Sequence, residues 1–159
     1  MISIIIPVFN ETENIKPLYD EVVSVLEKIG KDYEIIFVND GSLDTTQESI
    51  DSLFNKDSKH TRGIQLLAQS GKAAALHAGF QFAKGNIIFT MDGDLQDDPH
   101  EIPSFLKKLD EGYDLVSGWK QNRKDSFIKN NTSKIFNAVT NTISLVKLHD
   151  FNCGFKAYK

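Results

Sequence analysis

Short apolar runs alternate with longer amphipathic segments along most of the chain, and this alternation constrains the fold more than any other feature. Runs of this length, rich in Ile, Val and Phe, are typical of buried strands. Strand, helix, strand, helix order predicts right-handed crossovers, and therefore an α/β fold with a mostly parallel sheet. The expected strands are Ile2 to Ile6, Glu34 to Asn39, Gly63 to Leu67, Ile87 to Met91 and Asp114 to Gly118.

Residues that begin and end helices lie between the expected strands. Asn14 precedes the segment IKPLYDEVVSVLEKI, Pro17 falls within its first turn, and Gly30 follows its last residue. These are typical positions for a helix start and a helix stop. Further signals are two capping-box patterns, Asp44 with Gln47 and Asp98 with Pro99 and Glu101, and two glycines at expected helix stops, Gly85 and Gly112.

Composition and charge narrow the class of protein. A chain of 159 residues is about one domain long, and its formal charge of −4 argues against a nucleic-acid binder. No apolar run reaches the roughly 18 residues of a membrane span. Only Met1 precedes the first apolar run, so we expect no secretory leader. The single cysteine, Cys153, cannot form an internal disulfide, which favours a reducing, cytoplasmic location.

Polar segments follow the first four expected strands. They read PVFNETEN, NDGSLDTT, AQSGKAAAL and DGDLQDD in chain order. The carboxyl ends of parallel strands meet at one edge of a sheet, and ligands of open α/β sheets bind beyond that edge. We therefore expect the functional site there.

The segment after the fourth strand carries four aspartates within seven positions, and these would repel one another without a cation among them. Asp92 and Asp94 can point to one side and offer hard oxygen ligands to Mg²⁺ or Mn²⁺. Gln96 adds a carbonyl oxygen, and Gly93 lets a ligand approach the backbone closely. We interpret Asp97 and Asp98 as water-facing caps of the next helix.

A D-x-D pair alone is a weak signal, because it also occurs in phosphatases of the haloacid dehalogenase type. In that alternative the protein is a phosphohydrolase and Asp92 is the nucleophile. The phosphatase motif should follow the first strand and have Thr or Val after the second acid. Here it follows the fourth expected strand and is followed by Leu95.

Four blocks together carry a more specific resemblance: SIIIPVFNETENI, YEIIFVNDGSLDTT, GKAAALHAGF and FTMDGDLQDDP. In this order they resemble the inverting glycosyltransferases of family 2, which have the Rossmann-like, three-layer GT-A fold. The last stretches, YDLVSGWKQNRKDSFIKNNTSKIFN and LHDFNCGFKAYK, are similar to its polyprenyl-phosphate branch. That branch includes dolichyl-phosphate mannose synthase and bacterial undecaprenyl-phosphate glycosyltransferases.

The resemblance implies a site for a nucleoside-diphosphate sugar, UDP- or GDP-linked. Lys72, at the amino end of a helix, would contact the diphosphate, although LLAQSGK replaces the family's usual arginine, asparagine and aromatic before Gly-Lys. Asp92, Asp94 and Gln96 would hold the metal that stabilises the leaving group. The full donor set is Pro7, Phe9, Asn10, Glu11, Asp40, Ser42, Lys72, Asp92 and Gly93. Turn formation by NDGS and strand termination by Pro7 are the structural alternatives.

The resemblance also implies an acceptor side, where a polyprenyl phosphate would bind. The stretch from Trp119 to Lys134 has five cations against one acid. A lipid monophosphate is mostly a dianion at pH 7, so it needs orientation more than deprotonation. The expected acceptor-phosphate residues are Lys120, Arg123, Ser133 and Lys134. Asp94, through the metal, and Asp150, by orienting or activating the acceptor, are the expected catalytic residues.

Relatives of this branch continue into membrane-associated segments, whereas this sequence stops at Lys159, directly after the last motif. We expect residues 1–159 to be one GT-A catalytic domain, truncated at its carboxyl end, with 119–159 as its acceptor-side segment. The full-length form would then work at the cytoplasmic face of a membrane. The alternative is a domain that binds nucleotide sugar and metal but does not catalyse. The sequence does not identify the sugar or the nucleotide base. It also leaves open whether the protein forms a homo-oligomer.

Overall fold

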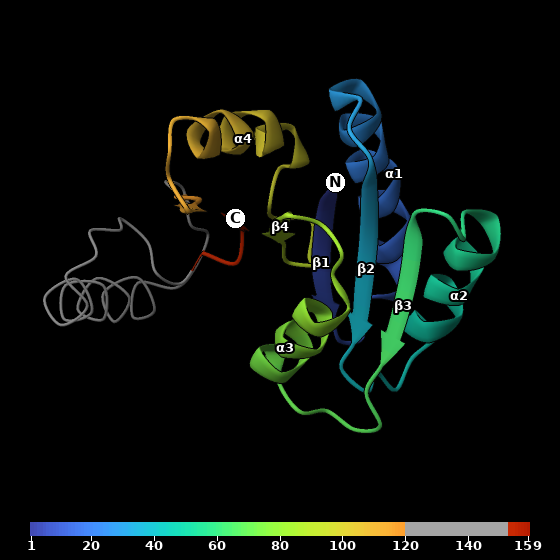
Figure 1. The fold of residues 1–159 in the computed structure, drawn as a ribbon. Helices are drawn as coiled ribbons and strands as arrows, with labels where there is room; N and C mark the ends of the chain where they lie inside the picture. Colours follow the sequence, from blue (N-terminus) through green and yellow to red (C-terminus); the bar gives the residue numbers. More distant parts are fainter. Residues whose placement is uncertain (120–152) are drawn as a thin grey trace, which may run out of the picture.

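The computed structural model of the chain describes residues 1–119 and 153–159. In this part, a six-stranded sheet runs between helices on both of its faces (Figure 1). The strands are β1 (Ile2–Val8), β2 (Tyr33–Asn39), β3 (Thr61–Gln65), β4 (Ile87–Thr90), β5 (Leu115–Ser117) and β6 (Lys156–Tyr158). The helices are α1 (Thr12–Ile29), α2 (Thr46–Lys56), α3 (Lys72–Phe82), the 3-10 turn η1 (Pro99–Glu101) and α4 (Ile102–Asp110).

The strand order is β3-β2-β1-β4-β6-β5. Strands β1 to β4 run parallel to one another, while β6 lies antiparallel between β4 and β5. The predicted α/β fold with a mostly parallel sheet is therefore confirmed, with one addition. The strand β6 was not predicted, because three residues are too few to show an alternation of apolar and polar side chains.

The two faces of the sheet pack against different helices. Successive side chains of a strand point to opposite faces, so Ile4 and Ile6 belong to one apolar cluster and Ile5 to the other. Buried side chains of α1, α2 and α4 complete the first cluster, and Ala75 of α3 belongs to the second. Among the described helices, none is both long enough and apolar enough to cross a membrane.

The helix signals of the sequence are confirmed only in part. The helix α1 begins at Thr12, before the predicted start at Asn14, and Gln47 does not complete a capping box with Asp44, because its side chain bonds Asn39 and Asp51. Gly30 ends α1 in the left-handed conformation, with φ of 68°. The side chain of Asp44 accepts a hydrogen bond from the Thr46 N–H at 3.1 Å, and that of Asp98 accepts one from the His100 N–H at 2.9 Å. Gly85 has another role than the expected helix stop. A Cβ there would lie 2.7 Å from the Ser3 nitrogen, so the glycine permits a close approach of backbones.

A buried polar network lies at the end of the sheet opposite to the expected site. The Glu34 carboxylate is almost fully buried, and it accepts hydrogen bonds from the Ser3 hydroxyl and the Lys84 N–H, both at 2.7 Å. Arg62 Nε donates to its second oxygen at 2.9 Å. Burial raises the pKa of Glu34, but these hydrogen bonds and the Arg62 charge outweigh it, and the net pKa is lowered. One ionised side chain thus joins β1, β2, β3 and the segment before β4.

Candidate functional site

A cavity of about 300 Å³ opens at the carboxyl ends of the parallel strands. It lies where the sequence predicts the functional site, between the segments that follow β1, β2, β3 and β4. Its lining residues are Pro7, Val8, Phe9, Glu11, Asp40, Gln69, Gly71, Lys72, Asp92, Gly93 and Asp94. We call this space the first cavity.

Asn10 and Ser42, two predicted donor residues, lie beside the first cavity and join its two nearest loops. The Asn10 N–H donates to the Ser42 hydroxyl at 2.9 Å, and the Asn10 side-chain oxygen accepts from the Leu43 N–H at 2.9 Å. Asn10 adopts a φ of 55°, a left-handed conformation that Asn tolerates better than most residues. The structure therefore gives both side chains a hydrogen-bonding role between the loops after β1 and β2.

Asp40 fixes the loop after β3 against the loop after β2. The residue is 5% exposed, and its carboxylate accepts hydrogen bonds from the backbone N–H groups of Ser70 at 2.7 Å and Gly71 at 2.9 Å. The neighbouring Gly41 has a φ of 70°, and a Cβ there would lie 2.6 Å from the carbonyl carbon of Ala68. The two loops are therefore in direct contact, and Asp40 forms a rigid part of the cavity wall.

The starts of α1 and α2 are tied together at the same edge. Asp44 accepts hydrogen bonds from the hydroxyls of Thr12, at 2.7 Å, and Thr46. Desolvation raises the pKa of Asp44, but the hydrogen bonds from Thr46 and Thr12 outweigh it and lower the pKa to about 2. The Glu11 N–H in turn donates to Thr46 Oγ1 at 2.9 Å. The backbone that presents Glu11 to the first cavity is thereby held to α2.

Lys72 brings a positive charge to the aspartates after β4. It is the first residue of α3, and its ammonium group forms an ion pair with the Asp92 carboxylate across the first cavity. The Lys72 side chain is half-exposed, whereas that of Asp92 is largely covered. A helix start favours negative charge, and the lysine adds to this effect. The cavity therefore holds both a cationic side chain and carboxylates that are candidate metal ligands.

Asp92 is closely surrounded by the segment before β6. A Cβ on Gly154 would lie 2.3 Å from Asp92 Oδ1, so only glycine fits beside this carboxylate. The Thr90 hydroxyl donates to the Gly154 carbonyl oxygen at 2.7 Å, which holds the glycine in place. Gly154, which the sequence analysis did not assign to the site, therefore shapes it.

The interpretation of Asp97 as a water-facing helix cap is wrong. Its side chain is buried, at 5% exposure, and its Oδ2 accepts a hydrogen bond from the Asp92 N–H at 2.9 Å. Asp98 is the exposed cap of η1, as expected. The sequence could not show which of the two is buried, because both acids directly precede a helix and their burial depends on how the loop folds.

The three predicted metal ligands do not all face the same cavity. Asp92 and Asp94 line the first cavity, and Asp94 Oδ1 also accepts the Gln96 N–H at 3.1 Å. Gln96 lines a second cavity of about 390 Å³. Its other lining residues are Asp97, Asp98, Glu101, Phe105, Gly118, Trp119, Cys153 and Phe155. The structure therefore brings together two of the three ligands.

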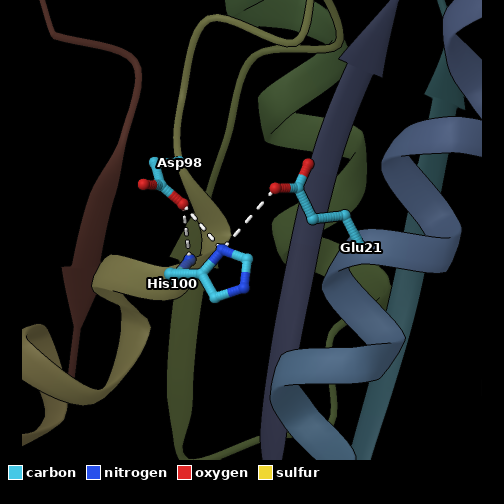
Figure 2. A group of neighbouring side chains, drawn as sticks. All are labelled: Glu21, Asp98 and His100. Carbon is cyan, nitrogen blue, oxygen red and sulfur yellow. Dashed lines mark hydrogen bonds and ion pairs between the residues drawn. The ribbon is translucent and has the colours of Figure 1, made fainter.

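Another group of metal-ligating side chains lies on the surface between α1 and η1. Figure 2 shows Glu21, Asp98 and His100 converging, with His100 Nδ1 at 3.0 Å from Asp98 Oδ1 and 3.6 Å from Glu21 Oε1. All three side chains are exposed. Contacts between the His100 ring and the two carboxylates account for this arrangement without a metal.

Five predicted residues fall outside the described part of the chain. These are Lys120, Arg123, Ser133, Lys134 and Asp150. Conversely, the first cavity includes Val8, Gln69 and Gly71, which the sequence interpretation did not assign to the site. Gln69 stands in the segment that departs from the family pattern, and that departure was the available signal.

Comparisons with known proteins agree with this fold. The model of a family described as "Glycosyl transferase family 2" matches residues 3–159. Glucosyl-3-phosphoglycerate synthase from Mycobacterium tuberculosis in complex with phosphoglyceric acid is 20% identical, with a TM-score of 0.76, and the match covers 100% of this chain and 56% of that chain. The same enzyme solved with Mn²⁺ and UDP-glucose is 21% identical over the same shares of both chains, with a TM-score of 0.75.

A mannosyltransferase, PcManGT from Pyrobaculum calidifontis, is also similar. It was solved in complex with GDP-Man and Mn²⁺, is 21% identical and has a TM-score of 0.70. The match covers 99% of this chain and 44% of that chain. The chain thus spans about half the length of the solved proteins that it matches.

Proposed function

The chain belongs to glycosyl transferase family 2, and on this basis we propose that it transfers a sugar from a UDP- or GDP-sugar to a polyprenyl phosphate. The reaction needs a divalent metal and inverts the anomeric centre. The observation that carries the proposal is the first cavity, where Lys72 at the start of α3 faces Asp92 and Asp94. Anion-binding and cation-binding groups side by side suit a metal diphosphate.

The residues of the first cavity fit Mg²⁺ or Mn²⁺. Asp92 and Asp94 supply carboxylate oxygens, the hard ligands that both ions prefer. When bound there, the metal would act as a Lewis acid on the leaving diphosphate. Lys72 would exchange its ion pair with Asp92 for a contact with a donor phosphate. Solved proteins of the same fold contain Mn²⁺ together with UDP-glucose or GDP-Man.

The remaining lining residues would hold the nucleoside. Pro7, near the end of β1, and Phe9 and Glu11, in the loop after β1, would lie against the base and ribose. Asp40 is already held by two backbone N–H groups, yet carboxylate oxygens have further lone pairs with which to accept from the nucleoside. Because Asp40 is rigid before the donor arrives, little entropy would be lost on binding.

The acceptor would meet the donor on the side of residues 119–159. We assign Lys120, Arg123, Ser133 and Lys134 to its phosphate, and Asp150 to its orientation or activation. A phosphate dianion attacks without a general base, so cations in the right place suffice. In full length, this catalytic domain would work at the cytoplasmic face of a membrane.

A soluble phosphorylated acceptor is the second candidate. One solved protein of this fold was crystallised with phosphoglyceric acid, which also carries a phosphate. Cations at the acceptor side would serve either molecule, so the two acceptors must be compared directly. Donor binding without turnover of either acceptor would indicate a domain that binds but does not catalyse.

Replacing Arg123 with Ala in the full-length protein is expected to raise the KM for polyprenyl phosphate far more than the KM for the nucleotide sugar. A hydrogen bond to a charged group contributes about 1.5 to 3 kcal/mol, which corresponds to roughly 10- to 150-fold. The measurement is a pair of titrations, one varying each substrate. A third titration with phosphoglyceric acid distinguishes the two acceptor classes.

Lys124→Ala is the matched control, because it removes an adjacent cation that we do not assign to the acceptor. A solvated side chain should change the acceptor KM by no more than about 0.5 kcal/mol, or about twofold. Unchanged acceptor titrations for single alanine variants of Lys120, Arg123 and Lys134 would contradict the phosphate-acceptor proposal. Asp150 would then become the candidate general base for a hydroxyl acceptor.

A further inference from the structure

We propose that Asp97 is a positioning residue that holds the backbone of Asp92 so that the Asp92 carboxylate points into the first cavity. This inference rests on the proposed function, because it assigns Asp92 to the metal diphosphate. It concerns a residue whose expected role, a helix cap, the structure does not support. Asp97 acts through the main chain of its neighbour and does not itself line the first cavity.

The contact that carries the inference is the hydrogen bond from the Asp92 N–H to Asp97 Oδ2, at 2.9 Å. The Asp97 side chain is buried, with 5% of its surface exposed. Removing a carboxylate from water is costly unless hydrogen bonds compensate for it. A hydrogen bond with an ionised acceptor is roughly twice as strong as one between neutral groups. The hydrogen bond from the Asp92 N–H therefore offsets part of the cost of burying the Asp97 carboxylate.

This hydrogen bond joins the two ends of the loop that carries both candidate metal ligands. Between them, Leu95 adopts a φ of 61°, and Asp94 Oδ1 accepts the Gln96 N–H at 3.1 Å. A non-glycine residue in the left-handed region is costly and persists where its surroundings enforce it. The hydrogen bond from the Asp92 N–H to Asp97 constrains the start of this loop. With the loop closed in this way, Asp94 lines the first cavity.

A small backbone shift at Asp92 would displace its carboxylate, because Gly154 confines that carboxylate on one side. Gly154 lies against it so closely that a Cβ would be 2.3 Å from Oδ1. Gly154 is itself held by the Thr90 hydroxyl at 2.7 Å. Partners that orient a metal ligand without touching the metal typically account for 10- to 100-fold in affinity. Asp97 is such a partner, because it bonds the Asp92 backbone and does not line the first cavity.

The test is the affinity for Mn²⁺, measured by the electron paramagnetic resonance signal of the free ion, in wild-type protein, Asp97→Ala and Asp97→Asn. Alanine removes the acceptor, so we expect the Mn²⁺ dissociation constant to rise roughly 10- to 100-fold. Asparagine keeps an oxygen acceptor but forms a weaker, neutral hydrogen bond, so we expect a rise of less than about fivefold. If Asp97→Ala does not fold, Asp97→Ser takes its place, since the shorter side chain cannot reach the Asp92 N–H.

Glu34→Gln is the matched control, because it neutralises another buried carboxylate that accepts a backbone N–H, at the far end of the sheet. It should lower stability and leave the Mn²⁺ affinity within about twofold of the wild type, since the two sites are distant. Wild-type affinity in folded Asp97→Ala, or a loss in Asp97→Asn as large as that in Asp97→Ala, would overturn the inference. Absence of Mn²⁺ binding by the wild type would overturn the proposed function as well.

Discussion

Replacing Asp94 with Asn is expected to abolish metal-dependent donor binding and to lower sugar transfer by about 10³-fold or more. Stabilisation of a leaving group by a bound metal is worth several kcal/mol, and each 1.36 kcal/mol is a factor of about ten in rate. Asp94 lines the first cavity next to Asp92, and a neutral amide holds a divalent cation less well than a carboxylate. Transfer from a radiolabelled UDP- or GDP-sugar, measured over a range of Mn²⁺ concentrations, checks this result.

Asp110→Asn is the control for this substitution, because it makes the same change at an exposed position at the end of α4. The control should keep the wild-type rate and the wild-type dependence on Mn²⁺. Wild-type metal dependence in Asp94→Asn would remove Asp94 from the metal site and leave the acids after β4 without their proposed role.

Replacing Glu34 with Ala is expected to destabilise the folded protein by about 3 kcal/mol. Removing one partner of a buried ion pair usually costs 3 to 5 kcal/mol, and the lower end of this range applies because Arg62 is half-exposed and can be hydrated. The loss leaves the Ser3 hydroxyl and the Lys84 N–H without their acceptor. For a chain of this size, the melting temperature should fall by about 6 to 12 °C. Calorimetry or circular dichroism measures the change.

The pH dependence of stability gives an independent check on Glu34. Its folded-state pKa is lowered below the ordinary value, so the stabilisation is fully present above the unfolded-state pKa and is lost as the pH falls through the folded-state pKa. Urea unfolding midpoints should therefore decrease less between pH 7 and pH 3 in Glu34→Gln than in the wild type. An identical decrease in both proteins would show that Glu34 does not contribute to acid unfolding.

The central parallel strands follow from the sequence because β1 and β2 are buried apolar runs, whereas the edge strand β3 has one buried residue and begins two residues before its predicted range. Ile2–Val8 and Tyr33–Asn39 are close to the predicted ranges, and both are buried on two faces, as parallel strands between helices must be. The edge beyond β4 was less predictable. Lys156–Tyr158 pairs with β4 through backbone hydrogen bonds, and no pattern of side chains in the sequence predicts this pairing.

The site could be predicted as a location, but not as a set of contacts. The carboxyl-edge rule places Asp40, Lys72 and Asp92 together, and all three line the first cavity. The ion pair between Lys72 and Asp92 spans 20 residues, and the fit of Gly154 against Asp92 spans a longer stretch of chain. Contacts of this kind depend on how loops close, and loops carry no periodic signal in the sequence.

The most direct test of a metal-dependent nucleotide-sugar site is a calorimetric titration of the protein with UDP and with GDP, each in Mn²⁺ and in EDTA. The carboxylates of Asp92 and Asp94 lie beside the anion-binding start of α3, so metal and diphosphate should bind together. We expect one of the two nucleotides to bind at least about tenfold more tightly in Mn²⁺, or about 1.4 kcal/mol more favourably. Equal affinity in Mn²⁺ and EDTA, or binding of neither nucleotide, would contradict the proposed site.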